Sequence, residues 1–155
     1  MDDKDLEIDL YLSAEARNNI IEYAKTAERY EFNNRWYQVS IPIEIVKEIT
    51  DRIPLTPTAI IFLVSLPYLR IPRHWDSRMA EHGWRTGLCW SMFPDNDKFA
   101  PTTLYNPFYT HYYTDKCFIF DTWREHSVVN NSYERSLFQI RYAESPEEIF
   151  EVINV

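Results

Sequence analysis

The chain has 155 residues, a formal net charge of −8 and a composition that is 45% apolar and 26% charged, which fits one globular domain over residues 1–155. Its two glycines, Gly83 and Gly87, stand apart from any glycine-rich run, which excludes P-loops and dinucleotide-binding fingerprints. The acidic balance and the absence of a Lys/Arg cluster argue against a general nucleic-acid binder.

The chain begins with the acidic stretch Met1–Ser13, which lacks the basic start and the long apolar run of a signal peptide. Because no run of about 18 apolar residues follows, we expect no membrane span and a cytoplasmic location. Ser13 predicts the N-cap of a helix that extends through Tyr30, since apolar residues recur behind it at helical spacing.

Three further elements are expected before Pro67. Trp36–Ile41 alternates and predicts a strand, and Ile43–Ile53 predicts a short helix that Pro54 stops. Ala59–Leu66 is a continuous apolar run between prolines, which favours a strand that is buried on both faces.

Beyond Pro67 the pattern changes to short aromatic or β-branched segments separated by Asp, Asn, Pro or Ser, which predict strands. These segments are Thr86–Phe93, Thr103–Tyr113, Cys117–Asp121, His126–Asn130 and Arg135–Tyr142. Ser145 followed by Pro146 then opens a last short helix. The two cysteines have no metal-knuckle spacing and are expected to be small buried residues. The order of elements, with helices first and about eight short strands afterwards, predicts an α+β fold in which the strands pack as a barrel or a sandwich.

Two short stretches carry the chemistry. In the first, His74 and Asp76 are two residues apart, so on a strand they share one face and converge. His126 follows 52 residues later, a separation that several strands would fill. Two histidines and one carboxylate on one face of a metal form the facial triad of non-haem Fe(II) oxygenases, which leaves positions open for a chelating co-substrate and dioxygen.

Arg135 lies nine residues beyond His126. A guanidinium on a neighbouring strand can hold the distal carboxylate of a dicarboxylic acid by a two-pronged, charge-assisted hydrogen bond. The keto acid end of the same molecule would then chelate the metal.

Together these residues resemble a known family. The stretch Ile71–Asp76 (IPRHWD), the later stretch Phe118–Asn131 (FIFDTWREHSVVNN) and Arg135 look like the Fe(II)/2-oxoglutarate dioxygenases. The aspartyl/asparaginyl β-hydroxylase-like and phage prolyl-hydroxylase-like members are the most similar. The resemblance covers Leu66–Tyr142, about half of the chain.

The resemblance implies a double-stranded β-helix, or jelly roll, with the N-terminal helices packed on one side. It also implies Fe(II) held by His74, Asp76 and His126, and 2-oxoglutarate anchored by Arg135. Arg85 is the nearest candidate for a second basic residue that assists 2-oxoglutarate. Asp121 matches a family acid that we interpret as a turn-former. A hydroxyl that often follows the anchoring arginine is replaced here by Leu137, so its counterpart must come from elsewhere.

The residues also allow plainer interpretations. In one of them His74 and Asp76 form a surface pair, and His126 is a strand-end histidine that forms a hydrogen bond with Asp121 or with a backbone carbonyl group. Arg135 then makes a surface ion pair with Glu134 or Glu144. His82 and His111 have no matching partner and are not expected to be ligands, whereas Arg78 is either an ordinary exposed arginine or a contact for an acidic substrate.

The sequence therefore predicts an Fe(II)- and 2-oxoglutarate-dependent dioxygenase that hydroxylates an unidentified substrate with dioxygen. A peptidyl or free amino-acid side chain is the first expectation for that substrate. The alternative is a cupin-like metal-binding or structural jelly-roll module without oxygenase activity, and Arg135 is the residue that distinguishes the two. The pattern does not predict an oligomeric state.

Overall fold

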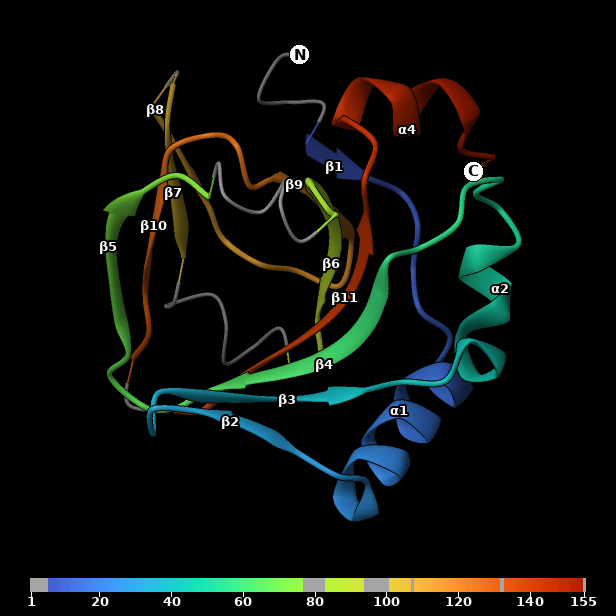
Figure 1. Ribbon diagram of the computed structural model, residues 1–155, viewed down its shortest axis with the longest axis horizontal. Coiled ribbons are helices and arrows are strands. Elements are labelled where there is room, and N and C mark those ends of the chain that lie inside the picture. Colours follow the sequence, from blue (N-terminus) through green and yellow to red (C-terminus); the bar gives the residue numbers. More distant parts are fainter. Residues whose placement is uncertain (1–5, 77–82, 94–100, 107, 132, 155) are drawn as a thin grey trace.

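The structure is a computed structural model that describes residues 6–76, 83–93, 101–106, 108–131 and 133–154. Its strands form two antiparallel sheets (Figure 1), one with the order β1-β9-β6-β11-β4-β3-β2 and one with the order β5-β10-β7-β8. The strands are β1 (Glu7–Ile8), β2 (Tyr30–Phe32), β3 (Trp36–Ser40), β4 (Ala59–Ser65), β5 (Arg70–His74), β6 (Thr86–Ser91), β7 (Thr102–Tyr105), β8 (Phe108–His111), β9 (Cys117–Asp121), β10 (His126–Val129) and β11 (Arg135–Tyr142). The helices are α1 (Ala14–Thr26), the 3₁₀ helix η2 (Ile43–Val46), α2 (Lys47–Thr50) and α4 (Pro146–Val152).

Helix α1 begins at the predicted cap, where the Ser13 hydroxyl accepts a hydrogen bond from the Ala16 N–H at 3.0 Å. The predicted end at Tyr30 is wrong, because the helix stops at Thr26 and Tyr30 already belongs to strand β2. The chain then reverses through Asn33 and Asn34, whose φ angles are 49° and 57°. Two consecutive left-handed residues form the turn that matches the twist of an antiparallel hairpin.

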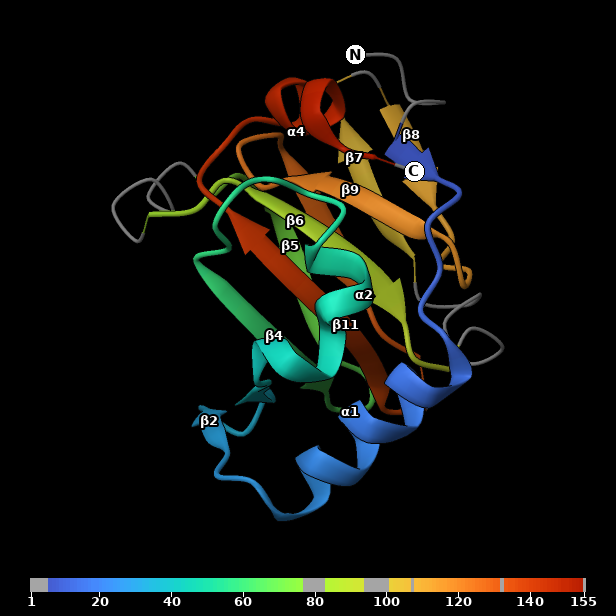
Figure 2. The same cartoon turned by 90° about the vertical axis from the view of Figure 1, so that its right-hand side faces the viewer.

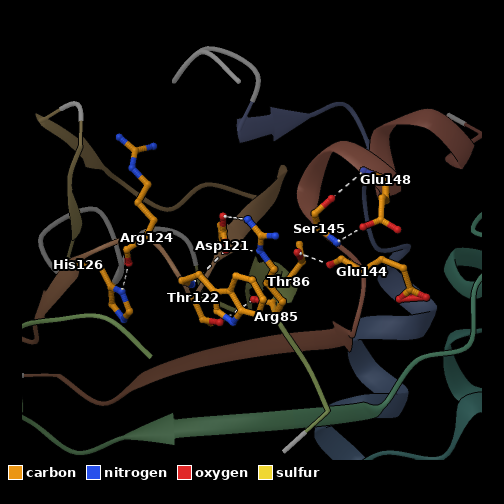
Figure 3. A network of polar contacts seen from close by, with 10 residues as sticks. Arg85, Thr86, Asp121, Thr122, Arg124, His126, Glu144, Ser145 and Glu148 are labelled. Carbon is orange, nitrogen blue, oxygen red and sulfur yellow. Dashed lines mark hydrogen bonds and ion pairs between the residues drawn. The ribbon is translucent and has the colours of Figure 1, made fainter. Parts of the chain in front are cut away.

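The two other helices predicted from the sequence are confirmed to different degrees. The predicted helix Ile43–Ile53 is shorter than expected and divides into η2 and α2. The last helix begins as predicted with a capping box, in which the Ser145 hydroxyl accepts from the Glu148 N–H and the Glu148 carboxylate accepts from the Ser145 N–H (Figure 3).

The helices lie on one side of the larger sheet, as the two views agree (Figures 1 and 2). The main hydrophobic core fills the space between them and that face of the sheet. Its fully buried members include Ile20 of α1, Ile49 of α2, Ile149 of α4 and the sheet residues Leu88, Trp90, Ile119, Phe138, Ile140 and Tyr142. Burial of side chains of this size is the largest favourable contribution to folding.

The opposite face of the larger sheet turns toward the smaller sheet, and the two enclose a cavity. Strand β4 shows the division: Phe62 and Val64 belong to the main core, whereas Leu63 and Ser65 line the cavity. The predicted burial on both faces is therefore only partly met, because Phe62 and Val64 are buried whereas Leu63 and Ser65 are partly exposed toward the cavity. The side-chain amide of Asn130, at the end of β10, donates to the carbonyl oxygens at the end of β4 and connects the two sheets.

Two mostly antiparallel sheets with few helices form a jelly-roll-like fold. The predicted α+β class is confirmed at this level. Within the described ranges, none of the helices has the length and apolar character needed to cross a lipid bilayer.

Candidate metal centre

Strand pairing brings the two predicted histidine ligands together. His74 ends strand β5, His126 begins strand β10, and the two residues are direct partners in the antiparallel register. Their ring centroids are 4.3 Å apart. Asp76 lies just beyond the end of β5, where its backbone N–H donates to the Thr122 carbonyl oxygen at 2.9 Å.

Backbone carbonyl groups fix the orientation of both rings. Nδ1 of His74 lies 2.6 Å from the Pro72 oxygen, and Nδ1 of His126 lies 2.7 Å from the Arg124 oxygen (Figure 3 shows the second contact). Because a carbonyl oxygen only accepts, each Nδ1 carries a proton, and in the neutral imidazole Nε2 is then the nitrogen that presents a lone pair. This tautomer is the one that a metal-binding imidazole needs.

The three side chains fit the coordination sphere of a small divalent metal ion. The Asp76 carboxylate oxygens lie 3.3 Å from His74 Nε2 and 3.3 Å from His126 Nε2. All three candidate ligand atoms lie within 4.8 Å of one another. Neighbouring ligands at bond lengths of ~2.1 Å are about 3.0 Å apart in an octahedral sphere, so only small movements are needed. Two imidazoles and one carboxylate are the ligand types of a facial triad.

A turn after strand β9 sets the position of His126. The Asp121 carboxylate accepts from the Trp123 N–H at 3.1 Å, and the Asp121 carbonyl oxygen accepts from the Arg124 N–H at 3.0 Å. This arrangement is an Asx-type turn, and it presents the Arg124 carbonyl oxygen to the His126 ring. The structure thus places Asp121 in the turn that was predicted for it.

Arg85 requires a correction, because the structure does not bring its side chain to the cavity. Its guanidinium forms two hydrogen bonds to Asp121, at 3.1 and 3.0 Å, and lies over the Trp123 ring (Figure 3 shows the pairing with Asp121). The hydrogen bond to Asp121 raises the pKa of Arg85. Arg85 therefore holds the turn before His126, and its donors are engaged there.

Arg135 lies in the same cavity as the triad. The cavity has a volume of about 570 Å³, and its lining includes His74, Asp76, His126 and Arg135. The side chain of Arg135 is 3% exposed, so it is not the surface residue of the plainer interpretation. Cavities of this size commonly bind small molecules.

Two hydroxyl groups that the sequence did not reveal stand beside Arg135. Its Nη2 atom lies 3.3 Å from the Thr102 hydroxyl, and its guanidinium lies 4.2 Å from the centre of the Tyr113 ring. The Thr102 and Tyr113 hydroxyls are 3.0 Å apart, and both residues line the cavity. Thr102 and Tyr113 thus bring hydroxyl groups close to Arg135, whereas Leu137 brings none. No local motif identifies them, because Thr102 lies on the smaller sheet and Tyr113 follows its strand β8, whereas Arg135 lies on the larger sheet.

A second guanidinium in the cavity, that of Arg141, was also missed. Arg141 shares the inward face of β11 with Arg135, and its Nε donates to the Gln139 side-chain oxygen at 2.7 Å. Its guanidinium lies 4.3 Å from the centre of the Trp84 ring. Burial lowers the pKa of Arg141 to about 10. Strand alternation places Arg141 on the same face of β11 as Arg135, so the sequence could have identified Arg141 as well.

The other residues named from the sequence have simpler environments. Arg78 and His82 lie outside the described residues. His111 is 1% exposed and stacks on Phe118 with a centroid distance of 3.8 Å, outside the cavity lining. Cys89 and Cys117 are free and buried, as expected, and burial raises the pKa of Cys89 to about 11.

Solved structures give matches where sequence comparisons do not. No protein-family model and no curated protein gives a significant match. An oxidoreductase of the 2OG-Fe(II) oxygenase family from Burkholderia pseudomallei is 12% identical, with a TM-score of 0.63 over 86% of this chain and 80% of that chain. A sugar phosphate isomerase of the cupin superfamily from Silicibacter pomeroyi is 9% identical, with a TM-score of 0.45 over 79% of this chain and 74% of that chain. The likeness to the Burkholderia protein shows a shared fold.

Proposed function

We propose that residues 1–155 form a single Fe(II)- and 2-oxoglutarate-dependent oxygenase domain with a double-stranded β-helix fold. The observation that carries the proposal is the placement of a His-Asp-His cluster and the buried Arg135 in one cavity. The fold shared with a protein of the 2OG-Fe(II) oxygenase family supports it. We further propose that the substrate is a peptidyl or free amino-acid side chain, and that the protein acts in the cytoplasm.

The chain supplies two binding sites within the cavity. His74, Asp76 and His126 hold Fe(II) through the two Nε2 atoms and the carboxylate, and the carbonyl groups behind the rings keep the Nδ1 protons in place. Arg135 binds the distal carboxylate of 2-oxoglutarate with the Thr102 and Tyr113 hydroxyls. When bound, Fe(II) and 2-oxoglutarate supply oxidative decarboxylation to succinate and carbon dioxide, coupled to hydroxylation of the substrate by dioxygen.

The remaining lining excludes water and restricts the ligands. The Phe120 ring meets the His126 ring edge to face, with a centroid distance of 4.7 Å. Val128 and Leu137 add apolar surface to the same cavity. Because charge–charge attraction is stronger where water is excluded, this lining strengthens the pairing of Arg135 with a carboxylate.

The proposal is tested by metal binding and by succinate formation. With Mn(II) as a probe, we expect one ion per chain by electron paramagnetic resonance, and a loss of affinity of at least about a hundredfold in Asp76→Asn, since loss of outer hydrogen bonds alone costs about 10–100-fold. Asp9→Asn is the matched control, because the Asp9 carboxylate is exposed and forms an ion pair with Lys116. With Fe(II), ascorbate and 2-oxoglutarate, the native protein is expected to form succinate.

Equal Mn(II) affinity in the native protein and Asp76→Asn would reject the metal centre. Metal binding without affinity for 2-oxoglutarate would instead favour a cupin-like metal-binding module, because such a module does not need Arg135.

A further inference from the structure

Arg141 occupies a place that the proposed chemistry does not use. Arg135 and Arg141 lie six residues apart on β11, so a strand rise of about 3.4 Å per residue separates their backbones by roughly 20 Å. Arg135 is beside Thr102, whereas Arg141 is beside Trp84 and Gln139. The cavity therefore has a guanidinium toward each end of one strand.

The surroundings of Arg141 are arranged to hold its side chain. Its partners on the neighbouring strands are Ala59 of β4 and Gly87 of β6, the smallest residues that the chain offers. A Cβ atom at Gly87 would lie 2.8 Å from the Gln139 Nε2 atom, so the glycine makes room for the amide that binds Arg141. The same amide donates to the Cys89 sulfur at 3.1 Å. Gln139 is thereby fixed with its oxygen toward Arg141.

The charges in the cavity leave one positive charge without a counterion. Within the described part of the chain, Arg141 makes no ion pair, and the acceptor of its Nε is the neutral amide of Gln139. In the proposed complex, Fe(II) and the dianion 2-oxoglutarate cancel each other. Asp76 balances one of the two arginines, so a charge of about +1 remains, and a partly buried charge such as that of Arg141 is costly without a partner.

We infer that Arg141, with Gln139 and Trp84, forms a subsite for a carboxylate group of the substrate. This inference rests on the proposed function and names the chemical class of its substrate, a monoanionic carboxylic acid. A guanidinium presents parallel N–H donors that match the two oxygens of a carboxylate. Nε is occupied by Gln139, so the two terminal nitrogens are left to bind the carboxylate. A phosphate monoester, with its charge near −2, would overcompensate the site.

The test uses trifluoroacetate as a carboxylate probe and trifluoroacetamide as its neutral counterpart. The protein is loaded with Mn(II) and saturating N-oxalylglycine, so that the Arg135 site is filled, and the ¹⁹F line width of each probe is measured. We expect saturable, Mn(II)-dependent broadening of trifluoroacetate, with an apparent affinity at least tenfold weaker in Arg141→Gln. Arg52→Gln, at an exposed arginine, is expected to behave as the native protein does, and trifluoroacetamide is expected to remain sharp.

Two further variants keep the test decisive if Arg141→Gln does not fold. Arg141→Met removes the partly buried charge while keeping much of the length of the side chain, a change that proteins often tolerate. Gly87→Ala is expected to displace the flexible end of Gln139 and to weaken trifluoroacetate binding by less than Arg141→Met does. Mn(II) binding measured in each variant reports that the metal centre is intact.

Broadening by trifluoroacetate that persists in Arg141→Gln and Arg141→Met would overturn the subsite and leave the metal centre unaffected. A loss of N-oxalylglycine affinity in these variants, equal to the loss for trifluoroacetate, would assign Arg141 to the co-substrate and also overturn the inference. Failure of the native protein to bind Mn(II) would reject the proposed function, and the inference with it.

Discussion

Strand β11 is covered on both faces, but the two faces differ in what covers them. Phe138, Ile140 and Tyr142 have no exposed surface and belong to the core between the sheet and the helices. Arg135 and Arg141, on the other face, line the cavity. The apolar face of this strand thus provides stability and the polar face provides the candidate site. In a strand that is buried on both sides, the face with the charged residues is the one to examine for function.

The largest expected effect concerns the stability of the outer face. We expect Phe138→Ala to lower the free energy of unfolding by about 3–5 kcal/mol, because it leaves a cavity in a packed core. The inward-facing Leu137→Ala is the matched control and should cost less, since Leu137 already borders open volume. Chemical denaturation followed by circular dichroism measures both. Equal losses would show that the two faces of β11 contribute equally to folding.

The next effect concerns the inner face. We expect Arg135→Leu to raise the requirement for 2-oxoglutarate by about tenfold or more, as follows from the loss of ~1.5–3 kcal/mol of charged hydrogen bonding. Its free energy of unfolding should change little, because removing a buried charge offsets the lost contacts. Titration of the Mn(II)-loaded protein with 2-oxoglutarate measures the first quantity, and Mn(II) affinity is the control. An unchanged requirement for 2-oxoglutarate would favour the cupin-like alternative.

The third effect concerns His111, on the smaller sheet near Arg135. Burial, together with the charge of Arg135, lowers the pKa of His111 from 6.5 to about 3. Glu7 Oε1 lies 3.5 Å from Nδ1, but among the described residues neither ring nitrogen has a hydrogen-bond partner. Because this geometry is poor and the Glu7 carboxylate is partly exposed, we expect burial to prevail.

The unfolded chain therefore binds a proton at His111 near pH 6.5, whereas the folded protein does not until about pH 3. Between these values the stability falls as the pH falls, by about 1.4 kcal/mol per pH unit from this group. We expect His111→Phe, which can keep the stacking on Phe118, to show a smaller slope by about that amount. Above pH 6.5 the two proteins should have the same pH dependence. Parallel stability curves between pH 4 and 6 would contradict the assignment.

The three residues of the candidate metal centre could be named from the sequence, because their order and spacing are visible along the chain. The two-residue spacing of His74 and Asp76 indicated that they converge, although Asp76 lies beyond the end of β5, where its N–H donates to the Thr122 carbonyl oxygen. Arg135 was identified by its spacing from His126 in the family resemblance, and it lies on the other sheet. The partners of Arg135 could not be predicted in this way. Thr102 lies on the second sheet and Tyr113 just beyond its strand β8, and the sequence gives no rule for which strands of two sheets face each other.

Other misses have local causes. The turn at Asn33 and Asn34 was a recognisable hairpin signal, since asparagine tolerates a positive φ better than most residues, and its oversight made the first helix too long. Arg85 was assigned to the cavity by its distance from the first ligand pair. That distance carries no information on the Asp121 carboxylate, which lies on β9 and binds the guanidinium. Asp121 therefore holds the Arg85 guanidinium away from the cavity.

Pro72 has a consequence for association between molecules. In the described part of the smaller sheet, β5 is an edge strand that pairs only with β10. Free edges can recruit strands of other chains, and proteins protect them with proline and with charge. Pro72 has no N–H to offer to an incoming strand, and Arg70 adds positive charge to the edge, whereas the charge of Arg73 is paired with Glu125. The residue whose carbonyl oxygen orients His74 thereby also helps to keep the protein from assembling edge to edge.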